Sequence, residues 1–288
     1  MDNTFDTDKR TLLKSALGVG GLVAGGGLIS SMAVVKQAHA QLLESGIPED
    51  STLAKIKQEG RLKVGYAQTL PWFQKSATEG GLNGIYYDLC EELGKALEIE
   101  MEYEETSWQN ATIGLRSGDF DVFGSSLFYT VPRALVVNYV GPMWRKGRLL
   151  VTHKDFVSEL PDDWRAFNDP KWTFSITIGT SEEDWIRNAF PEANLITSTG
   201  QITLALEPVR RKQAQLFAAG DLDAILYAEK NDWAHVIDKD KPIGLTPNTW
   251  AIRYGDPTFK AFLDFWGGHM LTSGWMQDRY DFYVNKMT

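Results

Sequence analysis

The sequence predicts an α/β protein built from two similar lobes. Predicted strands and helices alternate over residues 61–123, an order typical of layered α/β folds. A weak internal repeat is the second observation: Leu115–Phe123 and Phe217–Ile225 share a Gly-Asp-x-Asp core and lie 102 positions apart. In both copies we expect a helix to end at the glycine, before a strand. The period is too long for a solenoid, so it favours two lobes; chance reuse of a common turn is the alternative.

Composition limits the possible functions. The chain has 288 residues, 43% of them hydrophobic, which suffices for one large or two medium domains. Its net charge is −9 and it has no clustered basic stripe, which argues against a nucleic-acid partner. Cys90 is the only cysteine, so no intramolecular disulfide can form, and we expect it to be a small buried hydrophobe.

The first 40 residues have the pattern of an export signal. The stretch Lys9–Lys14 (Lys-Arg-Thr-Leu-Leu-Lys) resembles the twin-arginine motif with Lys in place of the first Arg. Residues 15–35 carry no charge, and Ala38-His39-Ala40 is a small-x-small cleavage pattern. We therefore predict residues 1–40 to be a cleaved signal and the protein to be periplasmic, without stable membrane insertion. An uncleaved anchor is the alternative, since the uncharged stretch is nearly long enough to span a bilayer.

The first lobe is predicted to comprise residues 61–150 and 248–288, after a linker and first helix over residues 41–60. Ser51 or Thr52 can cap that helix and Gly60 can end it. The other elements follow from apolar spacing and alternation. They are a strand over Arg61–Ala67, a helix over Tyr86–Leu97, a strand over Ile99–Glu105, a helix over Gln109–Arg116, a strand over Phe120–Phe123, a returning strand over Trp250–Arg253 and a closing helical region.

The second lobe is predicted over residues 151–247. Its first strand, Phe174–Ile178, is followed by Gly179-Thr180-Ser181 and a helix through Ala189. A hydroxyl residue caps this helix, and acidic residues stand in its first turn. The N–H groups at such a helix start suit an anion in the space between the lobes; plain capping is the alternative.

The segment Ser125–Arg133 carries the clearest chemistry. It reads Ser-Ser-Leu-Phe-Tyr-Thr-Val-Pro-Arg and follows a short apolar strand. Hydroxyls, backbone N–H groups and a guanidinium in one place suit a carboxylate, because Arg presents a planar fork to both oxygens. An ordinary strand exit with a surface Arg is the alternative.

From about Leu53 to Tyr283 the chain resembles the periplasmic solute-binding proteins of polar amino-acid ABC transporters, family 3. The resemblance rests on the order and spacing of several motifs. They are Gly60–Gly65, Gly84–Leu89 (Gly-Ile-Tyr-Tyr-Asp-Leu), Leu115–Asp121, Thr130–Arg133 (Thr-Val-Pro-Arg), Gly179–Ser181 and Gly220–Ala224. It implies a two-lobed, type II periplasmic-binding-protein-like fold, in which each lobe is a mixed sheet flanked by helices and the lobes close on a ligand by hinge motion.

The resemblance also implies ligand contacts. Arg133 would pair with a ligand carboxylate, and Ser126 with Thr180 or Ser181 would add hydrogen bonds. The aspartate that binds the ligand's ammonium in amino-acid binders appears here as Ala228, with Glu229 beside it. Glu229 would point to the other face of a strand, so an ordinary α-amino acid is in doubt.

Aromatic residues stand where polar ones are missing. Phe73 or Trp72, Trp108 and Phe128 are predicted to surround one point. Three rings can bind an alkylated or delocalised cation, a pattern that resembles the ectoine-binding branch of the family. The alternative is that some of these rings belong to the core.

The predicted function is capture of a small carboxylate-bearing ligand, amino-acid-like or a zwitterionic compatible solute, for an ABC transporter permease. We predict no enzymatic activity, no cofactor and no metal, because the sequence has no Ser–His–Asp order, phosphate loop or metal-ligand spacing. The alternatives are a sensor-linked binding module and a periplasmic dehydratase of the cyclohexadienyl type, in which Glu229 or Glu182 would supply the acid.

Overall fold

The computed structural model describes residues 46–76 and 80–287; the predicted signal, residues 1–40, lies outside this range. We use lobe 1 for the described residues of 46–137 together with 253–287, and lobe 2 for residues 154–242. The elements of lobe 1 are α2 (Thr52–Glu59), β1 (Arg61–Tyr66), β2 (Gln74–Lys75), β3 (Leu82–Asn83), α3 (Ile85–Leu97), β4 (Glu100–Glu105), α4 (Ala111–Ser117), β5 (Val122–Phe128), α5 (Val131–Ala134), α9 (Pro257–Thr272) and α10 (Trp275–Met287).

Two long strands, β6 (Asn138–His153) and β11 (Ile243–Ile252), connect this lobe with the other. The elements of lobe 2 are η1 (Lys154–Glu159), η2 (Trp164–Phe167), β7 (Thr173–Thr177), α6 (Ser181–Ala189), β8 (Asn194–Ser198), η3 (Ile202–Ala205), α7 (Leu206–Arg210), β9 (Leu216–Gly220), α8 (Asp221–Glu229) and β10 (Ala234–Ile237).

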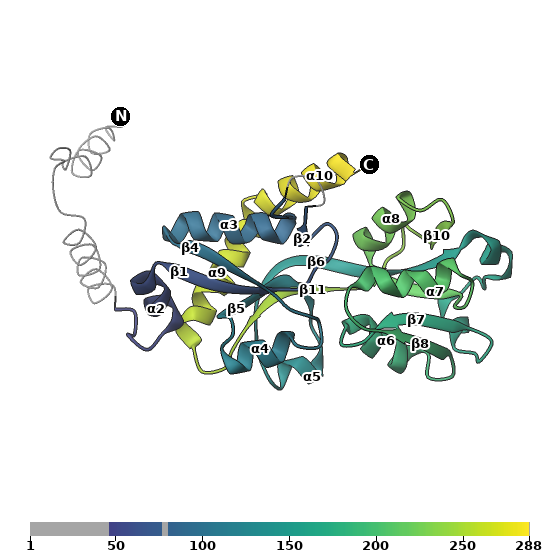
Figure 1. Ribbon diagram of the computed structural model, residues 1–288, viewed down its shortest axis with the longest axis horizontal. Coiled ribbons are helices and arrows are strands. Elements are labelled where there is room, and N and C mark those ends of the chain that lie inside the picture. The colour runs from purple at the N-terminus through teal and green to yellow at the C-terminus, as the bar shows by residue number, and fades with distance from the viewer. Residues whose placement is uncertain (1–45, 77–79, 288) are drawn as a thin grey trace, which may run out of the picture. The chain divides into compact units, whose positions relative to one another are not determined.

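A mixed sheet extends through both lobes along these two strands (Figure 1). Its order within the described part of the chain is β4-β1-β5-β11-β6-β9-β7-β8, and β10 also pairs with β6. Strands β1, β4 and β5 pair in parallel, as do β7, β8 and β9, whereas β6 and β11 run antiparallel to their neighbours. Strand β6 lies between β11 and β9, and Arg148 pairs with both, with Ile243 of β11 and with Gly220 of β9. The α/β fold expected from the sequence is confirmed.

Local signals explain most of the predicted elements. Ser51 caps α2 and accepts a hydrogen bond from the Leu53 N–H, while Gly60 ends the helix in the left-handed conformation at φ 71°. Thr180 caps α6 as expected. Cys90 is fully buried on α3, as predicted, and burial raises the pKa of its thiol.

Strand β5 is longer than the predicted strand over Phe120–Phe123. It runs from Val122 to Phe128, and all of its residues are buried. Ser125, Ser126 and Phe128 are therefore strand residues. Side chains two positions apart share a face of a strand, which directs Ser126 and Phe128 to the same side.

The second copy of the internal repeat is built the opposite way from the prediction. Residues 216–220 form strand β9 and residues 221–229 form helix α8, so Gly220 starts a helix where a helix was expected to end. Its φ of −55° lies outside the left-handed region that a glycine stop uses. Leu216–Gly220 is buried between β6 and β7, and Asp221 and Asp223 stand in the first turn of α8, where carboxylates favour a helix start.

Asp256 joins the starts of two helices that lie far apart in sequence. It caps α9 by accepting a hydrogen bond of 2.8 Å from the Phe259 N–H, and it also accepts from Thr52 N and, at 3.1 Å, from Ser51 Oγ. Burial pushes the pKa of Asp256 upward, but these hydrogen bonds outweigh burial and leave the pKa below its ordinary value of 3.8.

Replacing Asp256 with alanine is expected to lower the free energy of unfolding by about 1–2 kcal/mol, since two helix starts lose an acceptor. Asp256→Asn keeps one acceptor and should lose less of the free energy of unfolding.

Because the folded-state pKa of Asp256 is lowered, the stabilisation by the ionised carboxylate is present above pH 3.8 and is lost as the pH falls through the folded pKa. Urea unfolding near neutral pH and near ~pH 3 would measure both effects, and equal stability of Asp256→Ala and wild type would contradict the assignment.

Candidate functional site

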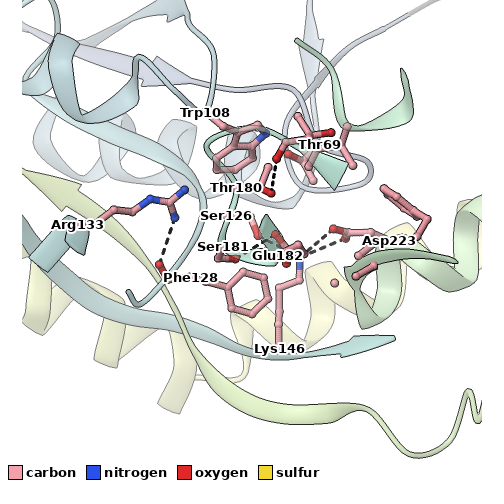
Figure 2. A pocket seen from close by; sticks show the side chains of 16 residues that line it. Thr69, Trp108, Ser126, Phe128, Arg133, Lys146, Thr180, Ser181, Glu182 and Asp223 are labelled. Atoms are coloured by element: carbon pink, nitrogen blue, oxygen red, sulfur yellow. Dashed lines mark hydrogen bonds and ion pairs between the residues drawn. The ribbon is translucent and has the colours of Figure 1, made fainter. Parts of the chain in front are cut away.

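A cavity lies where β5, α5 and β6 meet the first turn of α6, the end of β9 and the start of α8 (Figure 2). Its volume is about 20 Å³, room for about one water molecule, because side chains fill the space. The lining residues are Thr69, Trp108, Ser126, Phe128, Arg133, Lys146, Thr177, Thr180, Ser181, Glu182, Ile202, Phe217, Ala218, Ala219, Gly220 and Asp223.

Arg133 reaches this cavity from the last turn of α5. Thr130 caps that short helix and so fixes the backbone from which the side chain extends. The guanidinium donates to two main-chain carbonyls, Gly179 O at 2.6 Å and Phe128 O at 3.5 Å. No carboxylate of the described residues lies within 4.0 Å of it. Its hydrogen-bond partners are therefore neutral.

The start of α6 faces Arg133. Thr180 Oγ1 accepts from the Glu183 N–H at 3.2 Å and donates to Thr177 O at 2.7 Å, while Ser181 Oγ donates to Glu182 at 3.0 Å. Gly179 adopts φ 81°, and a Cβ there would lie 2.8 Å from the backbone nitrogen of Gln109. A glycine is needed at this position because it lets the turn approach lobe 1.

A buried ion pair occupies the other end of the cavity. Lys146 Nζ lies 3.2 Å from both oxygens of Asp223 and 3.1 Å from Ser126 Oγ. The two residues are 1% and 3% exposed. Asp223 also accepts a hydrogen bond of 2.5 Å from Trp72 Nε1. Burial raises the pKa of Asp223, while Lys146 and the Trp72 N–H oppose this rise.

The aromatic residues lie in different surroundings. Trp108 and Phe128 line the cavity, whereas Trp72 and Phe73 are fully buried and do not line it. Phe73 stacks on Tyr66 at 4.5 Å. Phe128 has Arg148 over its ring at 4.4 Å and Lys146 at 5.5 Å, and Trp72 has Lys146 over its ring at 4.3 Å. The structure thus does not bring all of these rings to one point, and the chain's own cations already contact two of them.

Of the other predicted site residues, Ser126, Arg133, Thr180 and Ser181 line the cavity. Glu229 does not, because residues 221–229 form a helix and Glu229 is the exposed last residue of it. The expectation that Ala228 and Glu229 end a strand is therefore wrong. Of the two carboxylates that follow the buried strand β9, Asp221 and Asp223, it is Asp223 that lines the cavity.

Sequence reasoning missed Lys146 and Asp223 as site residues, and also Arg148, which pairs with Glu182 at 3.6 Å. The spacing of Lys146 and Arg148 in the sequence could have linked these two cations to each other. Lys146 and Arg148 are two positions apart, which on a strand places both on one face. Sequence alone does not show which face of β6 is directed to the cavity.

Two buried polar atoms of the cavity wall have no hydrogen-bond partner among the described residues. They are the indole nitrogen of Trp108 and the hydroxyl of Thr69, and these residues are 7% and 4% exposed. An indole N–H can only donate, and a hydroxyl can donate one hydrogen. Buried donors of this kind are normally paired, so an acceptor in the cavity would satisfy them.

Titratable groups are concentrated at this site, but a metal centre is not indicated. Among residues 46–76 and 80–287, no group of three His, Cys, Asp or Glu side chains is arranged to hold a metal ion.

The same part of the chain contains no helix with the length and apolar character needed to cross a bilayer.

Comparison with known proteins adds a family match and several relatives. The family model described as "Bacterial extracellular solute-binding proteins, family 3" matches residues 62–286. Cyclohexadienyl dehydratase of Pseudomonas aeruginosa is 20% identical over 236 residues, which cover 82% of this chain and 87% of that protein. The L-cystine-binding protein TcyJ of Escherichia coli is 24% identical over 141 residues, covering 48% of this chain and 51% of that protein.

Solved structures with a similar fold cover most of the chain. The ancestral amino acid-binding protein AncCDT-1, a precursor of cyclohexadienyl dehydratase, has a TM-score of 0.74 and 25% identity and covers 81% of this chain and 99% of that one. A putative ABC transporter binding component from Wolinella succinogenes, complexed with lysine, has a TM-score of 0.70 and 25% identity, with 77% and 94% covered.

Proposed function

Because the chain belongs to family 3 of the bacterial extracellular solute-binding proteins, we propose that it captures a small carboxylate-bearing solute between its two lobes and passes it to an ABC transporter permease. The proposal includes export to the periplasm through the signal predicted in residues 1–40. The site is built from Arg133, Ser126, Thr180 and Ser181, with Trp108 and Phe128 as its apolar walls.

The observation that carries this function is the state of Arg133. Its guanidinium lines the cavity with only carbonyl oxygens as hydrogen-bond partners. A carboxylate can replace both carbonyls with one planar, bidentate partner of opposite charge, which is the stronger kind of hydrogen bond. The N-terminus of α6 faces the same point and favours negative charge there.

Two relatives support a small ligand that carries a carboxylate. The Wolinella succinogenes protein is complexed with lysine, and TcyJ is named for L-cystine. Both ligands carry a carboxylate. The cavity of this chain holds only about 20 Å³, so binding requires the lobes or their side chains to move apart first.

The test compares small carboxylic acids with their primary amides by isothermal titration calorimetry. For each acid that binds, we expect the primary amide to bind more weakly by about 2–4 kcal/mol, since the amide leaves the Arg133 charge unpaired. The probes are amino acids, oxo acids and aromatic acids. Carboxylate capture would be refuted if an acid and its amide bound with equal affinity, or if none of these acids bound.

A second function, dehydration of a cyclohexadienyl acid, has two observations in its favour. The dehydratase of Pseudomonas aeruginosa aligns with 82% of this chain, and the cavity contains two carboxyls, Glu182 and Asp223. Both already contact a cation of the chain. Incubation with prephenate separates the two functions: release of phenylpyruvate, water and carbon dioxide would show catalysis, and no turnover is expected of a binding protein.

A further inference from the structure

We propose that the ligand is an amine-free carboxylic acid, a 2-oxo or 2-hydroxy acid, because Lys146 already occupies the cation position of the site. The inference rests on the proposed capture of a carboxylate and narrows its ligand class. It is carried by the pairing of the charged groups and by the donors left without a partner.

The carboxylates of the cavity wall already have cations of the chain beside them. A ligand ammonium needs a carboxylate to replace its water, and the wall offers Asp223 and Glu182. Asp223 is paired with Lys146 through both oxygens and accepts from Trp72 as well. Glu182 lies 3.6 Å from Arg148. Each carboxylate thus has a cation of the chain beside it, and a second cation would meet like charge.

The rings of Phe128 and Trp72 likewise have cations of the chain beside them. The face of an aromatic ring can attract an alkylated or delocalised cation, as the resemblance to the ectoine-binding branch implies for Phe128. Here Arg148 lies 4.4 Å from the Phe128 ring centre, and Lys146 lies 4.3 Å from that of Trp72. Both cations belong to the chain itself, and Lys146 also lines the cavity. A cationic ligand group would have to displace them.

The cavity wall has donors that lack a charged acceptor or any acceptor. Arg133 has only neutral partners, and the Trp108 N–H and the Thr69 hydroxyl have none among the described residues. Arg133 and the Trp108 N–H can only donate, whereas the Thr69 hydroxyl can donate or accept. A ligand that matches the two obligatory donors presents acceptors: a carboxylate for Arg133 and a further oxygen for Trp108. A 2-oxo or 2-hydroxy acid has this arrangement, whereas a 2-amino acid places an ammonium where an acceptor is needed.

Matched ligand series test this inference by calorimetry on the wild-type protein. The probes are phenylpyruvate, phenyllactate and phenylalanine, together with 2-oxoglutarate, 2-hydroxyglutarate and glutamate. In the series that binds, we expect the oxo or hydroxy acid to have a Kd at least tenfold lower than that of its amino acid. A tenfold difference in Kd corresponds to about 1.4 kcal/mol of binding free energy. Tighter binding of the amino acid would overturn the inference and leave carboxylate capture intact. If no acid binds, the proposed function fails as well.

Variants of Lys146 test whether this side chain causes the preference for amine-free acids. Lys146→Ala removes the ammonium and leaves the cavity-lining Asp223 without its cation, so the preference should shift at least tenfold toward the amino acid. Lys146→Arg keeps a cation and should keep the wild-type preference. Arg145→Ala is the matched control, because Arg145 is the exposed neighbour on the opposite face of β6, and it should change nothing. Circular dichroism confirms folding, and an unchanged preference in folded Lys146→Ala would contradict the role of Lys146.

Discussion

Replacing Arg133 with alanine is expected to weaken binding of a carboxylate ligand by about 3 kcal/mol, roughly a hundredfold in Kd. The ligand charge would be held in a closed cavity without its bidentate partner, and truncation of one member of a buried charge pair is costly. The fold should be preserved, because Arg133 is only partly buried and pairs with no carboxylate within 4.0 Å among the described residues. Calorimetry of the variant with the best acid of the screen measures the effect.

Two further variants define the role of this side chain. Arg133→Lys keeps the charge but loses the planar fork, so its affinity should lie between those of wild type and Arg133→Ala. Arg145→Ala removes an exposed arginine twelve positions later in the chain and should leave the affinity unchanged. If Arg133→Ala bound as tightly as wild type, the carboxylate would have to lie elsewhere.

Asp223→Ala is expected to lower the free energy of unfolding by about 3–5 kcal/mol, because it leaves the Lys146 ammonium buried without its partner. The pair is almost completely buried, and the Trp72 N–H would lose its acceptor at the same time. Urea unfolding of the ligand-free protein measures the loss. Asp240→Ala, at an exposed position, serves as the control and should stay within about 0.5 kcal/mol of wild type.

A double variant distinguishes the loss of the Lys146–Asp223 ion pair from the loss of side-chain packing. Lys146→Met combined with Asp223→Asn removes both charges and keeps an oxygen for Trp72. It should be more stable than Asp223→Ala alone, since no charge is left buried. Equal losses in the single and double variants would show that the residues do not stabilise each other.

The fold could be predicted from the sequence where a local signal has one structural outcome. Apolar spacing gave α3, and the hydroxyl caps gave α2 and α6. The pattern Gly-Asp has two outcomes, because a glycine can end a helix and an aspartate can begin one. At Gly118 the helix ends, with φ 85°, whereas at Gly220 a helix begins. Burial of Leu216–Gly220 in the sheet decides the second case, and burial depends on contacts with β6 and β7.

The site was predictable on one side only. The Thr130–Arg133 segment and the turn at Thr180 are local patterns, so Arg133 and Thr180 could be assigned to a cavity between the lobes. Lys146 and Asp223 lie 77 positions apart, and only the packed lobes bring them together. The second-lobe carboxylate was expected at Glu229, at the end of a strand, whereas residues 221–229 form a helix and Asp223 is the carboxylate that lines the cavity.

Cys90 makes the chain convenient for labelling. It is the only cysteine in the sequence and is fully buried, and its raised thiol pKa disfavours the reactive thiolate. A maleimide dye should therefore react at one introduced surface position while the native thiol stays in place. Val131 is 76% exposed and lies two residues from Arg133. A dye attached after Val131→Cys would report optically on changes near Arg133, in a background where the native cysteine can stay.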